Sequence, residues 1–237
     1  MSRILLTVIL ITIISTLSNG ARADSHKNDG AAQPHASLFS GLKARLVGPA
    51  GMSGRIAAVD AVASDPNTIV VGASTGGLWM SHNGGLNWTP VFDDQPVASI
   101  GAVAINQSNP DIIWVGTGEG NVRNSTSVGG GIYKSVDGGK SFTYMGLGRT
   151  ERIHRIALHP DNPDVAYVAA LGQLWGENPE RGIFKTTDGG KNWSKVLYID
   201  QKTGATDIQM VPGNPNKLFA GMWQFRRWPY FFKSGGE

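Results

Sequence analysis

The sequence predicts an all-β fold, a β-propeller built from four-stranded antiparallel blades. Two short motifs recur in fixed order along the chain, which is the pattern of a repeat architecture with one structural unit per repeat. Runs of β-branched and aromatic residues lie between the motifs and are separated by Gly, Pro, Asn and Asp. No segment of the mature chain shows a sustained helical period. Four-stranded units of this length, repeated in line, are typical of propeller blades.

The first motif is a hydroxyl residue, any residue, Asp or Asn, two glycines, two further residues and an aromatic. It occurs as SHNGGLNW, SVDGGKSF and TTDGGKNW. The Asp is expected to accept backbone N–H bonds across a turn, the glycines permit positive φ, and the aromatic covers the turn. Asn83 lacks the charge that a cation site or a catalytic acid needs, so we predict a structural role. The residues with this role are Ser81, Asn83, Gly85, Trp88, Ser135, Asp137, Gly139, Phe142, Thr186, Asp188, Gly190 and Trp193.

The second motif contains a proline and occurs as SDPNTIVVGAS, SNPDIIWVGTG, DNPDVAYVAAL and GNPNKLFAGMW. In each blade, strand A precedes this proline motif (RIAAVDAVA, RIHRIALHP), and strand B lies within the motif. Strand C precedes the Gly-Gly turn (GGLWMS, GGIYKS, RGIFKT), and strand D follows it (NWTPVF, SFTYMG, NWSKVLY). The chain holds three full repeats and the first half of a fourth.

Three and a half blades predict an N-terminal fragment of a propeller, with the remaining blades in a longer chain. Propellers close with several blades, so that no long strand edge stays bare. The alternative is a stable part of a ring that assembles with copies of itself.

The N-terminus predicts a signal peptide over residues 1–23. Arg3 gives the positive start, residues 4–17 are almost entirely apolar, and Ala21-Arg22-Ala23 supplies a cleavage site after Ala23. A retained membrane anchor is the competing interpretation, but the apolar run is short for a span. We predict a secreted or periplasmic protein without membrane attachment after cleavage, a disordered leader over residues 24–40 and a partial propeller over residues 41–237.

Composition excludes several classes of function. The chain has 21 Lys and Arg against 18 Asp and Glu, and its basic residues form no clustered basic stretch, so no nucleic-acid partner is predicted. It has no Cys, which excludes disulfides, thiolate metal sites and Cys nucleophiles. Neither H-E-x-x-H nor G-x-S-x-G occurs, so no metal-dependent or Ser-His-Asp hydrolase is predicted. We predict no cofactor and no metal.

Tracing one blade places the A–B and C–D turns at one end, the turn face, and the B–C loops at the other, the loop face. The predicted B–C connections are uneven: STGG, TGEGNVRNSTSVGGG, LGQLWGENPERG and at least MWQFRRWPYFFKSGG. Long, uneven loops on one face of a regular scaffold usually carry binding residues. The predicted ligand-binding residues are Arg55, Glu119, Arg123, Arg152, His154, Trp175, Arg226, Arg227 and Trp228.

Alignment on the prolines places Arg55 and Arg152 at the loop-face start of an innermost strand, with His154 on the same side as Arg152. A cationic mouth there suits a carbohydrate or peptide that carries an acidic group. The alternative is that each Arg pairs with a loop Glu and only holds the loop face together. The aromatic run over residues 226–232 either stacks on a ligand or fills the core between blades.

The repeated turn motif resembles the Asp-box, or bacterial neuraminidase repeat. Together with the run GPAGMSGRIAAVDA, it resembles the sortilin/vacuolar-sorting-receptor type of propeller, and xyloglucan-cleaving glycoside hydrolases are similar. The resemblance covers about Leu46 to the C-terminus and implies a propeller that binds a peptide, protein or carbohydrate, or a glycoside hydrolase. A hydrolase needs two carboxylates, about 5–5.5 Å apart for retention or about 6.5–9.5 Å for inversion. Glu119 and Glu177 are the candidates. A sialidase would need an Arg triad with a Tyr–Glu pair, which the sequence does not assemble, and we favour binding over catalysis.

Overall fold

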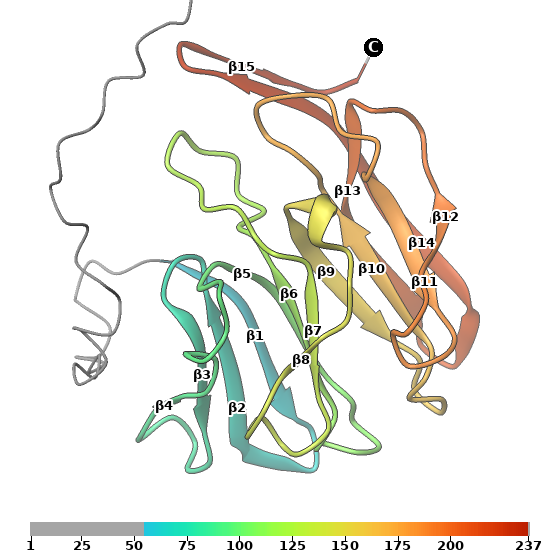
Figure 1. The fold of residues 1–237 in the computed structure, drawn as a ribbon. Helices are drawn as coiled ribbons and strands as arrows, with labels where there is room; N and C mark the ends of the chain where they lie inside the picture. Colours follow the sequence, from blue (N-terminus) through green and yellow to red (C-terminus); the bar gives the residue numbers. More distant parts are fainter. Residues whose placement is uncertain (1–54, 237) are drawn as a thin grey trace, which may run out of the picture. The chain divides into compact units, whose positions relative to one another are not determined.

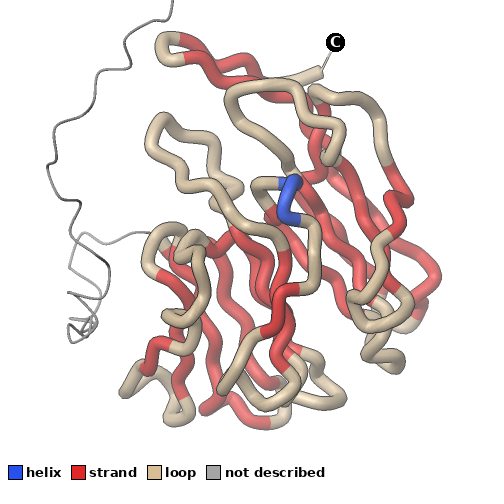
Figure 2. Tube along the Cα trace, viewed as in Figure 1, coloured by secondary structure: helices blue, strands red, loops and turns tan. Residues whose placement is uncertain are grey.

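A computed structural model describes residues 55–236, and these residues fold into four antiparallel sheets that follow one another along the chain (Figure 1). The predicted signal peptide and leader lie outside the described residues. A one-turn 3-10 helix at Gly148–Thr150 is the only helical element of the described range, and the rest is strands and connections (Figure 2). The predicted all-β fold is confirmed.

Three of the sheets have four strands and the fourth has three, and within each sheet neighbours in sequence are neighbours in space. The first sheet contains β1 (Ile56–Val62), β2 (Asp65–Ala73), β3 (Gly77–Ser81) and β4 (Thr89–Pro90). The second contains β5 (Ile100–Ile105), β6 (Ile113–Thr117), β7 (Ile132–Ser135) and β8 (Thr143–Tyr144). The third contains β9 (Ile153–Leu158), β10 (Ala166–Ala170), β11 (Gly182–Thr186) and β12 (Ser194–Leu197). The last contains β13 (Thr203–Val211), β14 (Asn214–Trp228) and β15 (Phe231–Ser234).

The first strand of each sheet is the innermost one, because β1, β5, β9 and β13 contact one another in series. One backbone hydrogen bond recurs at their loop-face ends. Ser74 N donates to Arg55 O at 2.8 Å, Gly118 N to Ser99 O at 2.8 Å, and Leu171 N to Arg152 O at 2.9 Å. Arg55, Ser99 and Arg152 therefore occupy equivalent places, as the alignment on the prolines predicts.

The fourth sheet differs from the prediction. The segment from Met222 was expected to be a B–C loop, but β14 continues without a break to Trp228 and turns back through two residues into β15. Trp223 lies 5.9 Å from the ring of Phe232 across the hairpin and packs with Phe225 in a small apolar cluster. This cross-strand aromatic packing stabilises an extended hairpin, which a count of loop length does not reveal.

The hydrophobic core lies between neighbouring sheets. Val70 and Leu78 of the first sheet pack against Ile113 of the second, and Trp114 packs against Val168 of the third. All five residues of β6 are buried because a sheet covers each of its faces. Each such side chain contributes roughly 1.5–3 kcal/mol when fully buried, so the contacts between sheets hold the fold together.

The C–D turns make the hydrogen bonds that the first motif predicts. Asp137 Oδ1 accepts from Ser141 N at 3.0 Å and from Ser135 Oγ at 2.7 Å. Asn83 Oδ1 accepts from Asn87 N at 2.9 Å in the first turn, so the amide replaces the carboxylate as the acceptor. The side chains of these three turns, at residues 81–88, 135–142 and 186–193, thus close the turns upon themselves.

The aromatic residues that end the turns do more than cover them. Phe142 stacks edge-to-face at 5.1 Å on Phe92, which lies two residues after β4, and Trp193 stacks in the same way on Trp114 of the second sheet at 6.0 Å. Trp193 Nε1 also donates to Met145 O at 2.7 Å. The second and third turns therefore fasten each blade to the one before it.

The carboxylates in these turns should make the stability of the fold decrease at acidic pH. Hydrogen bonds from Ser141 lower the pKa of Asp137 from 3.8 to about 2, and bonds from Asn192 lower the pKa of Asp188 equally. A lowered folded-state pKa stabilises the fold above the unfolded pKa, and this contribution disappears between about pH 4 and about pH 2. We expect Asp137→Asn to keep the melting temperature at neutral pH, as Asn83 does the same task, and to weaken the acid dependence.

Thermal melts followed by circular dichroism across this pH range test the prediction. The control is Asp94→Asn, which changes an exposed carboxylate after β4 and should keep the wild-type acid profile. Identical acid profiles for Asp137→Asn and the wild type would contradict it.

Candidate functional site

The structure has the two faces that the repeat predicts. Each C–D turn bonds to the A–B turn of its own sheet: Gly84 N donates to Asn67 O, Gly138 N to Asp111 O and Gly189 N to Asp164 O, each at 3.0 Å. The B–C loops and the starts of the innermost strands lie at the opposite ends of the sheets (Figure 1). The loop face carries all of the predicted ligand-binding residues.

Glu119 and Arg55 form an ion pair between the first two sheets. Glu119 lies two residues beyond the end of β6 and is completely buried, whereas the Arg55 side chain keeps 36% of its surface exposed. Ser99 Oγ accepts from Glu119 N at 3.1 Å. The pair holds the second B–C loop against the start of β1, and the Glu119 carboxylate has no open surface toward a ligand.

Arg152 and His154 also lie under loops. Arg152 is buried and donates to Glu151 at 3.2 Å and to Thr126 of the second B–C loop at 3.3 Å; burial lowers its pKa. Burial lowers the pKa of His154 as well, so this ring is neutral at neutral pH. A Cβ on Gly120 would lie 2.4 Å from the ring of His154, and only glycine permits this approach.

The third B–C loop is fixed by a buried arginine. Arg181 is completely buried and donates to the carbonyls of Leu171 at 2.8 Å, Gln173 at 2.5 Å and Gly176 at 3.1 Å. Its guanidinium also lies 4.5 Å over the ring of Phe225 in β14. Burial lowers the pKa of Arg181 to about 10, so it stays charged at neutral pH. This residue joins the loop to the fourth sheet.

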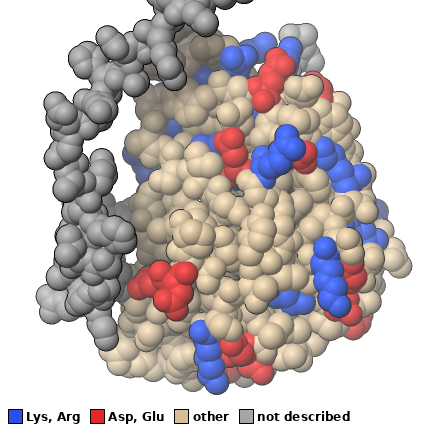
Figure 3. All heavy atoms as spheres, viewed as in Figure 1, with Lys and Arg blue, Asp and Glu red and all other residues tan. Residues whose placement is uncertain are grey.

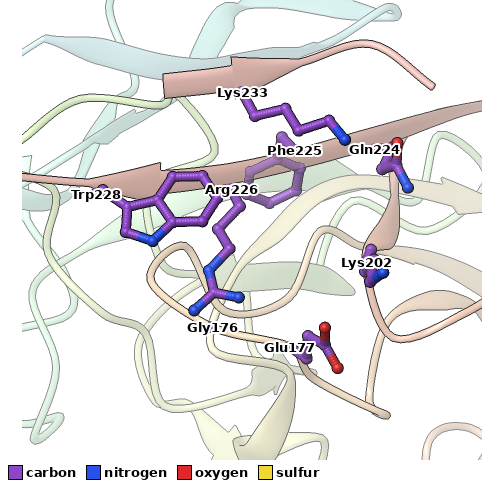
Figure 4. Close-up of a pocket in the computed structure, with 8 residues that line it drawn as sticks. All are labelled: Gly176, Glu177, Lys202, Gln224, Phe225, Arg226, Trp228 and Lys233. Atoms are coloured by element: carbon purple, nitrogen blue, oxygen red, sulfur yellow. The ribbon is translucent and has the colours of Figure 1, made fainter. Parts of the chain in front are cut away.

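A cavity of about 170 Å³ opens beside this loop at the β14–β15 hairpin, and we call it the hairpin pocket (Figure 4). Arg226 and Trp228 project into it from β14, Lys233 extends over it from β15, and Glu177 and Lys202 stand on the opposite side in Figure 4. The full lining is Gly176, Glu177, Lys202, Gln224, Phe225, Arg226, Trp228 and Lys233.

Strand alternation explains how the hairpin builds the pocket. Gln224, Arg226 and Trp228 are two residues apart along β14 and share one face. Lys233 is the cross-strand partner of Arg226, so two cations stand directly opposite each other. The Arg226 guanidinium lies 4.7 Å from the Trp228 ring, which holds it in place.

The pocket gathers only part of the predicted set. Glu177, Arg226 and Trp228 line it, and Trp175 precedes the lining residue Gly176 with 40% of its surface exposed. Arg227 points away from it and bonds to Asn124 of the second B–C loop. The other predicted residues, Arg55, Glu119, Arg123, Arg152 and His154, are not among its lining residues.

Lys202, Gln224 and Lys233 were not predicted. Lys202 directly precedes β13, and its carbonyl accepts the equivalent backbone hydrogen bond from Phe225 N at 3.3 Å, but the alignment on the prolines places Gly204 at this position. The predicted B–C loop gives Gln224 and Lys233 no fixed direction, whereas the alternation of a strand places them beside Arg226 and Trp228.

The turn face has grooves that repeat with the blades. A groove of about 580 Å³ between the second and third sheets includes Lys134, Asp164 and Asp188, and one of about 320 Å³ between the first and second includes the equivalent Asp111 and Asp137. Their recurrence at equivalent positions makes them a product of blade stacking.

Other classes of site are not apparent in residues 55–236. Within that range there is no cluster of three or more His, Cys, Asp or Glu arranged to hold a metal ion. The helical content there is one 3-10 turn, too short to cross a membrane. Basic and acidic side chains are interspersed on the face shown in Figure 3, without a continuous basic stripe.

Comparison with known proteins shows which solved structures have a similar fold. No protein-family model and no curated protein sequence matches this chain. Among solved structures, an ancestral GH74 enzyme is 22% identical over 72% of this chain, with a TM-score of 0.55. A GH74 enzyme of Niastella koreensis is 22% identical over 70%, with a TM-score of 0.54. The GH74 xyloglucanase from Xanthomonas campestris is 19% identical over 77%, with a TM-score of 0.53.

This chain spans 22%, 27% and 28% of the lengths of those three proteins. At such identities the likeness shows the fold alone. The described residues form consecutive blades of a β-propeller, in agreement with the prediction from the sequence. The predicted likeness to the sortilin type of propeller stays a prediction.

Proposed function

We propose that this chain is an exported ligand-binding propeller that takes a peptide, protein or glycan on its loop face. The hairpin pocket is the observation that carries the proposal, because it is a concave site with converging polar groups and an aromatic ring. It lies between the third B–C loop and the fourth sheet, the place where a regular scaffold presents variable segments.

Binding fits the carboxylates of this face better than glycoside hydrolysis does. Hydrolysis needs two carboxylates that face the scissile bond. Glu177 is the single carboxylate in the lining of the hairpin pocket, and Glu119 is buried in its ion pair with Arg55. The GH74 proteins support a carbohydrate as one class of ligand only through their shared fold.

Printed arrays of oligosaccharides and of peptides test the proposal, with the labelled protein as the probe. We expect binding to one of the arrays. Trp228→Ala should weaken that binding about tenfold or more, because it removes the pocket's aromatic wall. Trp88→Ala is the matched control, since Trp88 is an accessible tryptophan of the turn face. Equal losses in the two variants, or no binding to either array, would overturn the proposal.

Reducing-end release from soluble polysaccharides separates binding from hydrolysis. We expect the wild type to release none while it is retained on the polysaccharide it binds. Release by the wild type that falls about 10²–10⁴-fold in Glu177→Gln would instead assign Glu177 as a general acid or base.

A further inference from the structure

We infer that the hairpin pocket binds a uronic acid residue, the carboxylate-bearing sugar of an acidic polysaccharide. The inference rests on the proposed function and deepens it by naming the class of ligand. It depends on three features of the pocket: its unbalanced charge, its unused hydrogen-bonding groups, and its size together with the aromatic residues around it.

The net positive charge of the pocket lining favours an anionic ligand. Arg226 and Lys202 bring two positive charges to a lining whose only carboxylate is Glu177, and Lys233 is a third cation of the lining. Arg226 and Lys233 are direct cross-strand partners, and like charges in this arrangement repel each other. Neither Arg226 nor Lys202 forms an ion pair with a carboxylate of residues 55–236. A bound carboxylate would relieve this repulsion.

The pocket also has hydrogen-bonding capacity that residues 55–236 do not use. Gln224 Oε1 and Arg226 Nε are buried and have no hydrogen-bond partner in this range. Such groups are rare in folded proteins, and each needs a reason. Glu177 is exposed on the opposite side of the pocket and can accept from hydroxyl groups. The pocket thus offers both kinds of group to a ligand: Arg226 and Lys202 can donate, and Gln224 Oε1 and Glu177 can accept.

Size and surroundings favour one ring of a longer glycan. The pocket's 170 Å³ lies below the roughly 300–1,000 Å³ of sites for drug-sized ligands, so it suits a single residue. Trp175 directly precedes the lining residue Gly176, and Tyr230 lies two residues after the lining residue Trp228; they are 40% and 89% exposed. Their rings have electron-rich faces that attract the C–H face of a pyranose.

An acidic sugar matches this arrangement better than an acidic peptide does. A uronic acid carries a carboxylate and several hydroxyl donors on one rigid ring, so its carboxylate can lie between Arg226 and Lys202 while one of its hydroxyl groups donates to Glu177. The side chain of a peptide Asp or Glu supplies the carboxylate without the hydroxyl donors. The pocket would discriminate a uronic acid from an acidic peptide through Glu177, which can accept hydrogen bonds from the hydroxyl groups of the sugar.

Calorimetry with tri-galacturonate and with its fully methyl-esterified form tests the inference. Esterification removes the charges and keeps the rings, so the pair isolates the carboxylate. We expect tri-galacturonate to bind about tenfold or more tightly than the ester, and its affinity to fall as salt is raised. Equal binding of acid and ester would overturn the inference.

Variants locate the binding. Arg226→Met and Lys202→Met should each weaken tri-galacturonate binding about tenfold, since each removes a charge that faces the carboxylate. Lys217→Met is the matched control, because Lys217 is an exposed lysine of the same strand β14 and lies outside the pocket. The variants must keep the wild-type circular dichroism spectrum and melting temperature. Loss of affinity in Lys217→Met equal to that in Arg226→Met would place the binding elsewhere.

The outcomes separate the inference from the proposed function. If an array peptide or a neutral glycan binds in a Trp228-dependent manner and tri-galacturonate does not, the acidic-sugar inference is overturned and loop-face binding stands. If neither the arrays nor tri-galacturonate is bound, both fail.

Discussion

Replacing Arg55 by Met is expected to lower the free energy of unfolding by about 3–5 kcal/mol, as the loss of one partner of a buried ion pair does. The cause is the other partner. Glu119 is completely buried, and without Arg55 its carboxylate would face no countercharge among the described residues. Urea unfolding at neutral pH, followed by tryptophan fluorescence, measures the loss.

Glu119→Gln is the informative comparison for this pair. Its loss should be smaller, about 1–3 kcal/mol, because the Arg55 side chain is 36% exposed and water can solvate it in the variant. The double replacement of Arg55 and Glu119 by Met should recover much of the stability, since no charge remains buried. A loss below about 1 kcal/mol in Arg55→Met, the range of exposed pairs, would show that the pair is not a buried one in solution.

The ion pair between Arg55 and Glu119 shows which features of this protein can be predicted from its sequence and which cannot. The repeats predicted the sheets, their order and the two faces, because turn chemistry and strand period are local properties. Arg55 and Arg152 were placed correctly at the loop-face ends of innermost strands by the same repeat. Whether such a cation meets a ligand or a carboxylate depends on a loop from another blade, which no local pattern encodes.

The hairpin pocket also depends on contacts between distant segments, which the sequence alone does not predict. Arg226 and Trp228 were predicted from their types, but Lys202 and Lys233 became part of the site only through the pairing of β14 with its neighbours. The expected long loop concealed the strand, because the repeat places a B–C loop after Met222, although aromatic residues are enriched in strands. Their cross-strand packing decides between the two.

Arg181→Met is expected to lower the free energy of unfolding by about 3–5 kcal/mol, because three hydrogen bonds from a charged donor are lost, and to abolish binding at the hairpin pocket. The buried carbonyl of Leu171 and the half-buried carbonyls of Gln173 and Gly176 lose their donor, and a fully buried acceptor left unsatisfied costs about 1–3 kcal/mol. Gly176 and Glu177 line the pocket, so a loosened loop removes one of its sides. Urea unfolding and calorimetry on the same variant measure the two losses.

Arg155→Met is the matched control, because Arg155 is an exposed arginine in an ion pair with Asp207 at 3.0 Å, and surface pairs contribute about 0–1 kcal/mol.

The pH dependence of the stability loss in Arg181→Met adds a second criterion. Burial lowers the pKa of Arg181 on folding to about 10, so the group is charged in the folded and unfolded states at every pH well below 10. Its titration affects stability only between this pKa and the higher pKa of the unfolded state, where stability rises with pH. The deficit of Arg181→Met should therefore be constant around neutral pH, and a deficit that varies there, or one no larger than that of Arg155→Met, would show that Arg181 does not hold the loop as a buried cation.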